Sequence, residues 1–154
     1  MGNPVFIRLC EAILNDVLNI ARHSVPNIAG AVSLAPVLDV TDSPAVNVIP
    51  LSLTSNVWDR GAQVQSASVL VELTGYVGTS EISAYAPYFE AVENLLNSLP
   101  FLTYALDGAT FSPLSARLAN SSADAYVEGG DAGAYGFKTS VSLELRRIVR
   151  RANA

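Results

Sequence analysis

The sequence predicts an α+β domain, in which two main α-helices pack on one face of an antiparallel or mixed β-sheet. Three observations predict this fold. Two stretches carry apolar residues at helical spacing, others alternate apolar and polar residues as strands do, and the order is helix, loop, strands, helix, strands. The 154 residues suit a single domain spanning 1–154, because domains typically contain about 100–200 residues.

The first helix is expected over residues 4–22. Asn3 is a residue type that caps helices, and Pro4 suits the first helical position. The apolar residues that follow share helical spacing: Phe6, Leu9, Cys10, Ile13, Leu14, Val17, Ile20 and Ala21. They predict one broad buried stripe, on which the single cysteine is a small core residue rather than a nucleophile.

The next segment gives a weaker signal. Residues 24–44 contain three prolines and predict only short extended pieces, at 31–34 and 37–40. A strand is expected over 45–51, where Pro50 indicates a sheet edge or the end of the strand.

A polar, glycine-containing segment follows at 52–66 and predicts a long loop, whose residues 53–66 form a flexible arm. Loops of this length are usually functional or disordered. The arm holds the only tryptophan, Trp58, followed by Asp59 and Arg60. We expect Trp58 to anchor a contact with another protein chain, with packing against its own domain as the alternative.

The strongest signals lie in the middle of the chain. Residues 67–76 alternate apolar and polar side chains, which predicts a strand with one apolar face. Residues 81–98 show apolar i, i+3, i+4, i+7 spacing, which predicts a helix whose start Pro87 delays. The last third predicts strands over 101–106, 110–118 and 125–128, a turn over 128–136, and a final alternating strand from Phe137.

Charged residues make up only 15% of the chain and hydrophobic residues 50%, against about 25% charged in ordinary soluble proteins. This shortage predicts that other subunits cover part of the surface, because interface cores are depleted in charge. A monomer rich in Ser, Thr and Asn is the alternative. The net charge of −5 is uneven, since a basic C-terminal tip at 146–154 contains Arg146, Arg147, Arg150 and Arg151. This tip is expected either to contact an acidic partner or to stay solvated.

Side chains suited to catalysis are few. The single histidine, His23, follows the first helix, where a cation stabilises the helix dipole. With one histidine and one cysteine, the chain cannot assemble a zinc site or a Cys–His nucleophile. The glycine-rich segment 129–133 lacks the Lys-Ser/Thr pair of a phosphate loop and leads into a strand. We therefore expect a protein that is not an enzyme, binds no metal or cofactor, and has no apolar run of the ~18 residues that a membrane span needs.

The order of the elements resembles one known family. A first helix is followed by the strand NVIPLSL, an arm with Trp58-Asp59-Arg60-Gly61, the strand SVLVELTGYV, the helix YFEAVENLLNSL and the strand GFKTSVSLELRRI. Over residues 45–149 and the first helix, this order is similar to that of the tail terminator and tail-completion proteins of tailed bacteriophages, which take part in head-to-tail joining.

The resemblance implies a structural virion protein, located in the tail or neck after assembly in the host cytoplasm. It implies a ring, expected to be a hexamer, that caps the tail tube and joins it to the neck or connector. The implied partners are copies of the chain, the tail-tube protein and a neck or connector protein, with the tail sheath as a further candidate. DNA is expected to pass through the ring without specific binding, and no membrane is involved.

The candidate interface residues on this chain are Trp58, Asp59, Arg60, Arg146, Arg147, Arg150 and Arg151. Two alternative functions stay open. One is a head–tail neck or adaptor protein of the same assembly, and the other is a non-viral module that binds a small ligand or peptide.

Overall fold

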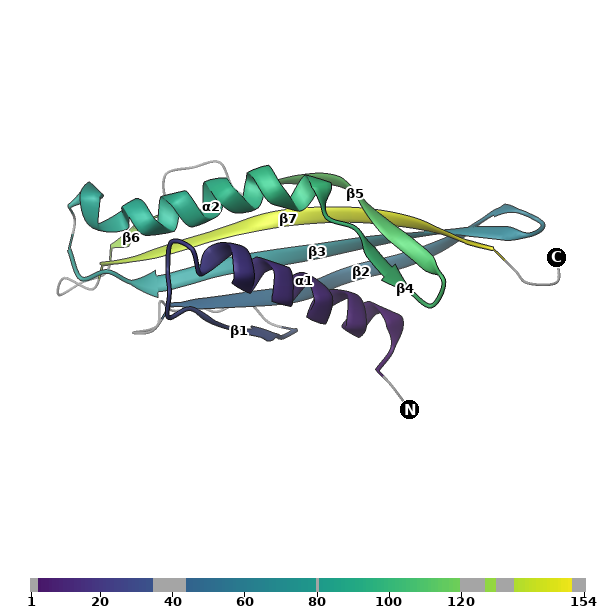
Figure 1. Ribbon diagram of the computed structural model, residues 1–154, viewed down its shortest axis with the longest axis horizontal. Helices are drawn as coiled ribbons and strands as arrows, with labels where there is room; N and C mark the ends of the chain where they lie inside the picture. Colours follow the sequence, from purple (N-terminus) through teal and green to yellow (C-terminus); the bar gives the residue numbers. More distant parts are fainter. Residues whose placement is uncertain (1–2, 35–43, 80, 120–126, 130–134, 151–154) are drawn as a thin grey trace.

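The computed structural model describes residues 3–34, 44–79, 81–119, 127–129 and 135–150. Two α-helices contact each other and pack on one face of a long curled sheet, which confirms the predicted α+β fold (Figure 1). The helices are shorter than the central strands, so one end of the sheet extends past them.

The sheet contains seven strands within these residues, in the order β1-β2-β3-β7-β5-β4, and β6 also pairs with β7. Their bounds are β1 Ala29–Val32, β2 Ala45–Asp59, β3 Ala62–Tyr76, β4 Tyr104–Leu106, β5 Ala109–Leu118, β6 Val127–Gly129 and β7 Tyr135–Arg150. The β1–β2 pair is parallel and the other described pairs are antiparallel, so the sheet is mixed.

The first helix, α1 (Val5–Ala21), lies where the helical spacing predicts it. Its fully buried residues belong to the predicted stripe: Leu9, Cys10, Ile13, Val17 and Ala21. The expected cap is wrong, because the helix begins one residue later and Pro4 takes the N-cap position without a side-chain bond. The side-chain amide of Asn3 instead donates to Oε1 of Glu11 at 3.1 Å.

The second helix, α2 (Ala86–Ser98), lies between two short 3₁₀ helices, η1 (Ile82–Tyr85) and η2 (Leu99–Phe101). Pro87 lies in the first turn of α2. The regular helix starts at Ala86 and not at the predicted residue 81, a delay that the proline predicts. Glu90 on this helix is exposed.

The core lies between the helices and the side of the sheet that faces them. Alternate residues of β3 and β7 are buried there, among them Val69, Val71, Leu73, Val141, Leu143 and Leu145. Tyr88 of α2 stacks on Phe137 of β7, with ring centroids 5.1 Å apart. Gly75 of β3 lies against the same tyrosine, and a Cβ there would overlap its ring, so this close approach requires glycine.

The predicted loop over 52–66 is wrong. β2 and β3 stay paired out to Asp59 and Ala62, and Arg60-Gly61 forms a two-residue turn between them. The outer residues of β2, 51–57, are exposed, so no buried face imposes the apolar alternation by which a strand is recognised in a sequence. Pro50 lies inside β2 at a register shift, beyond the last residue that β1 pairs, which fits its predicted place on a sheet edge.

Other boundaries differ by a few residues. β1 lies two residues before the extended piece predicted at 31–34, and β4 occupies only the end of the predicted 101–106 because η2 takes its start. β7 continues to Arg150, so the first five residues of the predicted basic tip are strand. The extended piece predicted at 37–40 and residues 151–154 lie outside the described part of the chain.

Candidate functional site

The far ends of β2, β3 and β7 form a three-stranded β-arm, defined by residues 51–66 and 146–150. The β-arm extends past both helices at one end of the molecule (Figure 1). Val57, near its tip, keeps 73% of its surface exposed. The β-arm is therefore more exposed than the part of the sheet on which the helices pack.

The outer edge of β2 is open along the β-arm. β1 pairs with β2 only up to Val48, and no strand of the described residues continues this pairing. Residues 45–58 carry no charge, and Leu51, Leu53 and Val57 are exposed. Edge strands are usually kept short or protected by charge, because their unpaired N–H and C=O groups recruit other strands. A long, uncharged and partly apolar edge therefore suits contact with another chain.

The turn at the tip brings two of the predicted interface residues together. The backbone N–H of Gly61 donates to Oδ1 of Asp59 at 2.7 Å, so this carboxylate helps to close the turn. Arg60 is exposed beside it and has no ion-pair partner within the described part of the chain. Trp58 belongs to β2, but its side chain lies outside what the structure describes. The guanidinium of Arg60 is therefore exposed at the tip, whereas the carboxylate of Asp59 is bonded within the turn.

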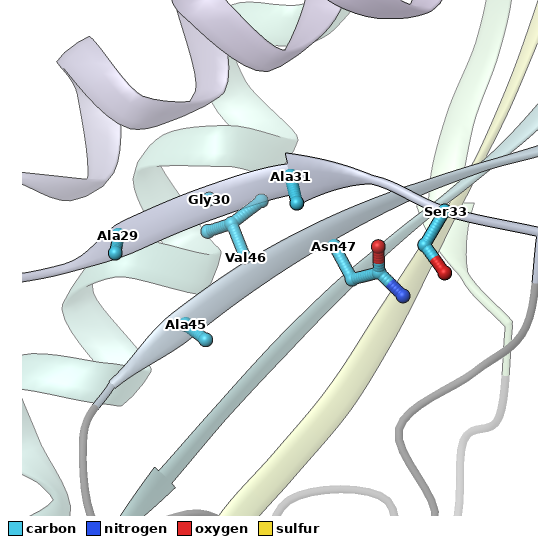
Figure 2. Close-up of a pocket in the computed structure, with 7 residues that line it drawn as sticks. All are labelled: Ala29, Gly30, Ala31, Ser33, Ala45, Val46 and Asn47. Atoms are coloured by element: carbon cyan, nitrogen blue, oxygen red, sulfur yellow. The ribbon is translucent and has the colours of Figure 1, made fainter.

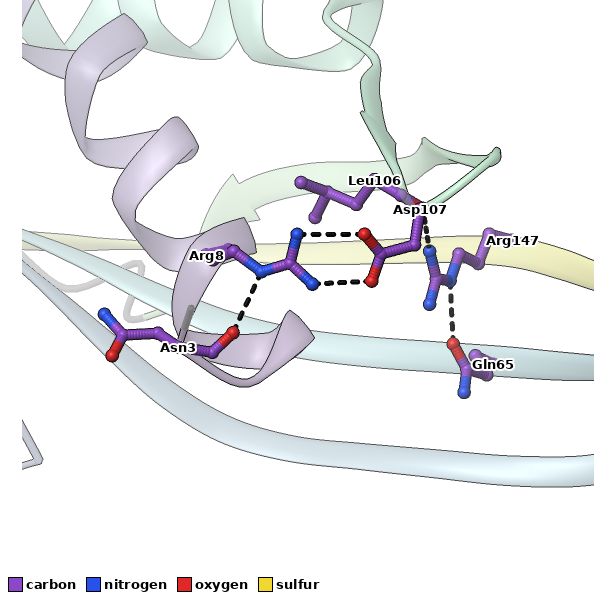
Figure 3. A network of polar contacts seen from close by, with 6 residues as sticks. All are labelled: Asn3, Arg8, Gln65, Leu106, Asp107 and Arg147. Atoms are coloured by element: carbon purple, nitrogen blue, oxygen red, sulfur yellow. Dashed lines mark hydrogen bonds and ion pairs between the residues drawn. The ribbon is translucent and has the colours of Figure 1, made fainter. Parts of the chain in front are cut away.

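Arg147 is buried, with 6% of its surface exposed, although the sequence places it in a basic tip. Its Nε donates to Oε1 of Gln65 at 2.7 Å, and its Nη1 donates to the carbonyl of Leu106 at 2.6 Å (Figure 3). Its guanidinium also lies 4.6 Å from the centre of the Phe111 ring, within reach of a cation–π interaction. The prediction that Arg147 meets a partner is therefore wrong, because its guanidinium is bonded within the chain.

A second arginine holds the β4–β5 hairpin from the side of α1. Both terminal nitrogens of Arg8 donate to the carboxylate of Asp107, at 3.0 and 2.5 Å, and its Nε donates to the carbonyl of Asn3 (Figure 3). Asp107 and Gly108 have positive φ angles of 51° and 81°, as a two-residue hairpin turn favours. The turn at the base of the β-arm is thus tied to both α1 and β7.

The Arg8–Asp107 pair makes a pH-dependent contribution to stability. The hydrogen bonds from Arg8 lower the pKa of Asp107 below its ordinary value of 3.8. Because the pKa is lower in the folded state, the contribution is fully present above that ordinary value and is lost as the pH falls through the lowered pKa. Both side chains are partly exposed, so solvent weakens the effect.

The remaining basic candidates lie on the other side of β7. Arg146 and Arg150 alternate with Arg147 along the strand and are exposed, while Arg151 lies outside the described residues. With Arg60 and Arg147, the β-arm carries four arginines against one aspartate. It is therefore a basic element of a chain whose net charge is −5.

A hollow of about 380 Å³ lies beside the parallel β1–β2 pair (Figure 2). Its lining residues are Ala29, Gly30, Ala31, Ser33, Ala45, Val46 and Asn47. None of these side chains titrates in the ordinary pH range, and only two are polar, so the lining offers no acid–base pair or metal ligand set. Within the described residues there is also no group of three or more His, Cys, Asp or Glu side chains placed to hold a metal ion.

The α+β fold and the open β-arm define the class of structure. The sequence matches no protein-family model, and no curated protein is significantly similar to it. Among the described residues, no helix is both long and apolar enough to cross a membrane.

The sequence patterns did not predict the β-arm, and they did not identify the turn between the strands predicted at 101–106 and 110–118, although each leaves a signal. The β-arm is visible in the spacing of Leu51, Leu53 and Val57, which keeps the period of a strand across polar residues. The hairpin before β5 is visible in the Asp107-Gly108 dipeptide, a strong short-range turn signal. The partner of Arg8 leaves no such signal, since the two residues lie 99 positions apart.

Proposed function

We propose that this chain is a structural subunit of a bacteriophage tail, a tail terminator that forms a ring on the tail tube and joins it to the neck. The proposal rests on the β-arm, whose open edge at residues 51–57 is exposed, uncharged and partly apolar. Such an edge suits strand-to-strand or apolar contact with another chain better than it suits water.

The charge distribution supports an assembling subunit. A ring subunit meets identical neighbours on two sides, so much of its surface is covered, and the chain's low charged share of 15% fits such coverage. The basic β-arm suits contact with the acidic surface of a neighbouring protein. Arg60, Arg146 and Arg150 are the exposed residues that we place in this contact.

The small-ligand alternative gains no support from the hollow beside β1 and β2. Specific ligand sites combine apolar walls with a few convergent polar groups that fix the ligand's orientation. Five of the seven lining residues are Ala, Gly or Val, and Ser33 and Asn47 are the two polar ones.

Electron microscopy of the purified protein tests the proposal, first alone and then with the tail-tube protein encoded in the same genome. We expect rings, either free or seated on the ends of the tubes. Rings that bind the connector but leave tube ends bare would instead favour the neck or adaptor role. A chain that stays monomeric in both samples and leaves every tube end bare would contradict both phage roles.

A further inference from the structure

A second exposed apolar surface lies toward the opposite edge of the sheet from β2. Phe101 of η2 keeps 82% of its surface exposed, and Leu114 of β5 keeps 57%. η2 contacts β5, and Leu114 lies at the register shift between Pro113 and Ser115, where the strand is irregular. The sheet order places β5 and β2 toward opposite edges, separated by β7 and β3. The molecule therefore has two unlike exposed apolar surfaces, toward opposite edges of its sheet.

The second surface carries acidic side chains on its α2 side, while Arg117 of β5 is an exposed cation at its other end. α2 runs along the β7 and β5 side of the sheet, and its Glu90 and Glu93 are exposed (Figure 1). Outside the β-arm, the described residues include nine acidic side chains and four basic ones. We call the surface formed by η2, β5 and the outer side of α2 the acceptor surface.

We propose that the β-arm of one copy docks on the acceptor surface of a second copy. This inference rests on the proposed function, because it names the two surfaces through which a ring of this subunit closes. The apolar edge at Leu53 and Val57 would cover Phe101 and Leu114, while the exposed arginines approach the two glutamates of α2. A contact that joins one surface of a copy to a different surface of the next copy is heterologous. Heterologous contacts generate rings when the rotation between copies closes.

The charge pattern also argues against pairing of one β-arm with another. A symmetric contact between two β-arms would offer Arg60, Arg146 and Arg150 only Asp59 as an acidic residue, and the N–H of Gly61 already bonds that carboxylate. Nucleic acid is disfavoured as the occupant because the open edge of β2 is uncharged over residues 45–58 and exposes leucine and valine. A second copy supplies both the acid and the apolar cover that the β-arm lacks.

Cysteine cross-linking tests this contact on the full-length chain. Val57→Cys and Phe101→Cys are made in separate chains, because both side chains are exposed and their replacement leaves the core unchanged. The native Cys10 is fully buried, so it does not compete for the reagent. The two variants are mixed and treated with a short bis-maleimide, and the products are separated under denaturing conditions. Asn19→Cys, on the exposed side of α1, replaces Phe101→Cys in the control mixture.

The expected product is a covalent heterodimer in the Val57/Phe101 mixture and none in the Val57/Asn19 control. A chain that carries both cysteines should give a ladder of multimers. Homodimers of the Val57→Cys chain alone would overturn the proposal in favour of arm-to-arm pairing. Equal products in the test and control mixtures, or no product in either, would overturn it as well.

Charge exchange gives a second test. Reversing Arg146 and Arg150 to Glu, or Glu90 and Glu93 to Arg, should each reduce the cross-link yield severalfold. Combining all four changes in one chain should restore the yield, because the opposite charges face each other again. If each double variant lowers the cross-link yield and the combined variant does not restore it, these residues do not face one another.

The outcomes separate this inference from the proposed function. A protein that caps tail tubes but gives no specific cross-link loses the arm-to-acceptor contact and keeps the terminator role. A protein that gives the specific cross-link but ignores both tube and connector keeps the contact and loses the terminator role.

Discussion

Arg147 shows how one residue's role depends on the strand that carries it. The sequence groups it with Arg146, Arg150 and Arg151 as a basic tip, yet strand alternation turns its side chain toward the helices, where it is buried. There it joins Gln65 of β3 to the carbonyl of Leu106, so the base of the β-arm depends on it.

Replacing Arg147 by Ala should lower the free energy of unfolding by about 2–4 kcal/mol, since two charge-assisted hydrogen bonds and the contact with Phe111 are lost together. Urea unfolding followed by circular dichroism measures the change. The matched control is Arg146→Ala, which removes an exposed neighbour and should stay within about 0.5 kcal/mol of the parent protein. Equal losses in the two variants would contradict the assigned role.

Cys10 is a second residue whose behaviour follows from burial. Its thiol has no exposed surface, and burial raises its pKa to about 11, so the thiol stays protonated in neutral solution. We predict that a thiol reagent at pH 8 labels the native protein only as fast as it unfolds. Labelling in urea should be rapid and stoichiometric. Rapid labelling of the folded protein would show that the thiol is accessible and would revive a chemical role for it.

At the level of elements, α2 shows what helical periodicity can and cannot resolve. Leu95 and Leu96 are adjacent apolar residues within the predicted helix 81–98, but Leu95 is 1% exposed and Leu96 is only partly buried. The helix meets the sheet along one line, and small rotations of its axis decide which of two adjacent leucines faces the core.

Leu95→Ala should therefore destabilise the fold by about 2–5 kcal/mol, because it leaves a cavity in the core. Leu96→Ala is the matched control and should cost about 1 kcal/mol, since its side chain is only partly buried. Thermal and urea unfolding of the two variants under identical conditions compare them. A larger loss for Leu96 would mean that α2 is rotated about its axis relative to the structure described here.

The β2–β3 hairpin is the element where sequence patterns failed most clearly. Strands are recognised by an apolar face, and the outer half of this hairpin is exposed, so its polar residues read as a loop. The inner half, over which α1 packs, was predicted correctly from its alternation. In this one pair of strands, the apolar–polar alternation is therefore clear where the strands are buried and weak where they are exposed.

At the scale of the molecule, the strands that build the core are also the strands that extend beyond it as the β-arm. The inner parts of β2, β3 and β7 build the core, and the β-arm adds little buried apolar surface. Contacts between copies, if made through the β-arm, can therefore be removed without removing the core.

A shortened β-arm tests this separation. Replacing residues 56–64 by Asn-Gly, a favourable two-residue hairpin turn, keeps Gln65 for its bond to Arg147. The variant should keep its circular dichroism spectrum and unfold cooperatively, with a midpoint within about 5 °C of the parent. It should fail to form rings in electron microscopy. Loss of cooperative unfolding would show instead that the β-arm is part of the folding core.

The amino-acid pattern alone predicts the α+β class, both helices, the central strands and the burial of Cys10, because one-sided burial imposes a local period on each of these segments. Only the folded structure reveals that residues 52–59 are strand, that Arg147 faces inward, and that Arg8 meets Asp107. These outcomes depend on which distant segments the folded chain brings together. No local period records such contacts, and for the same reason the open edge of β2 appears only once the neighbours of each strand are known.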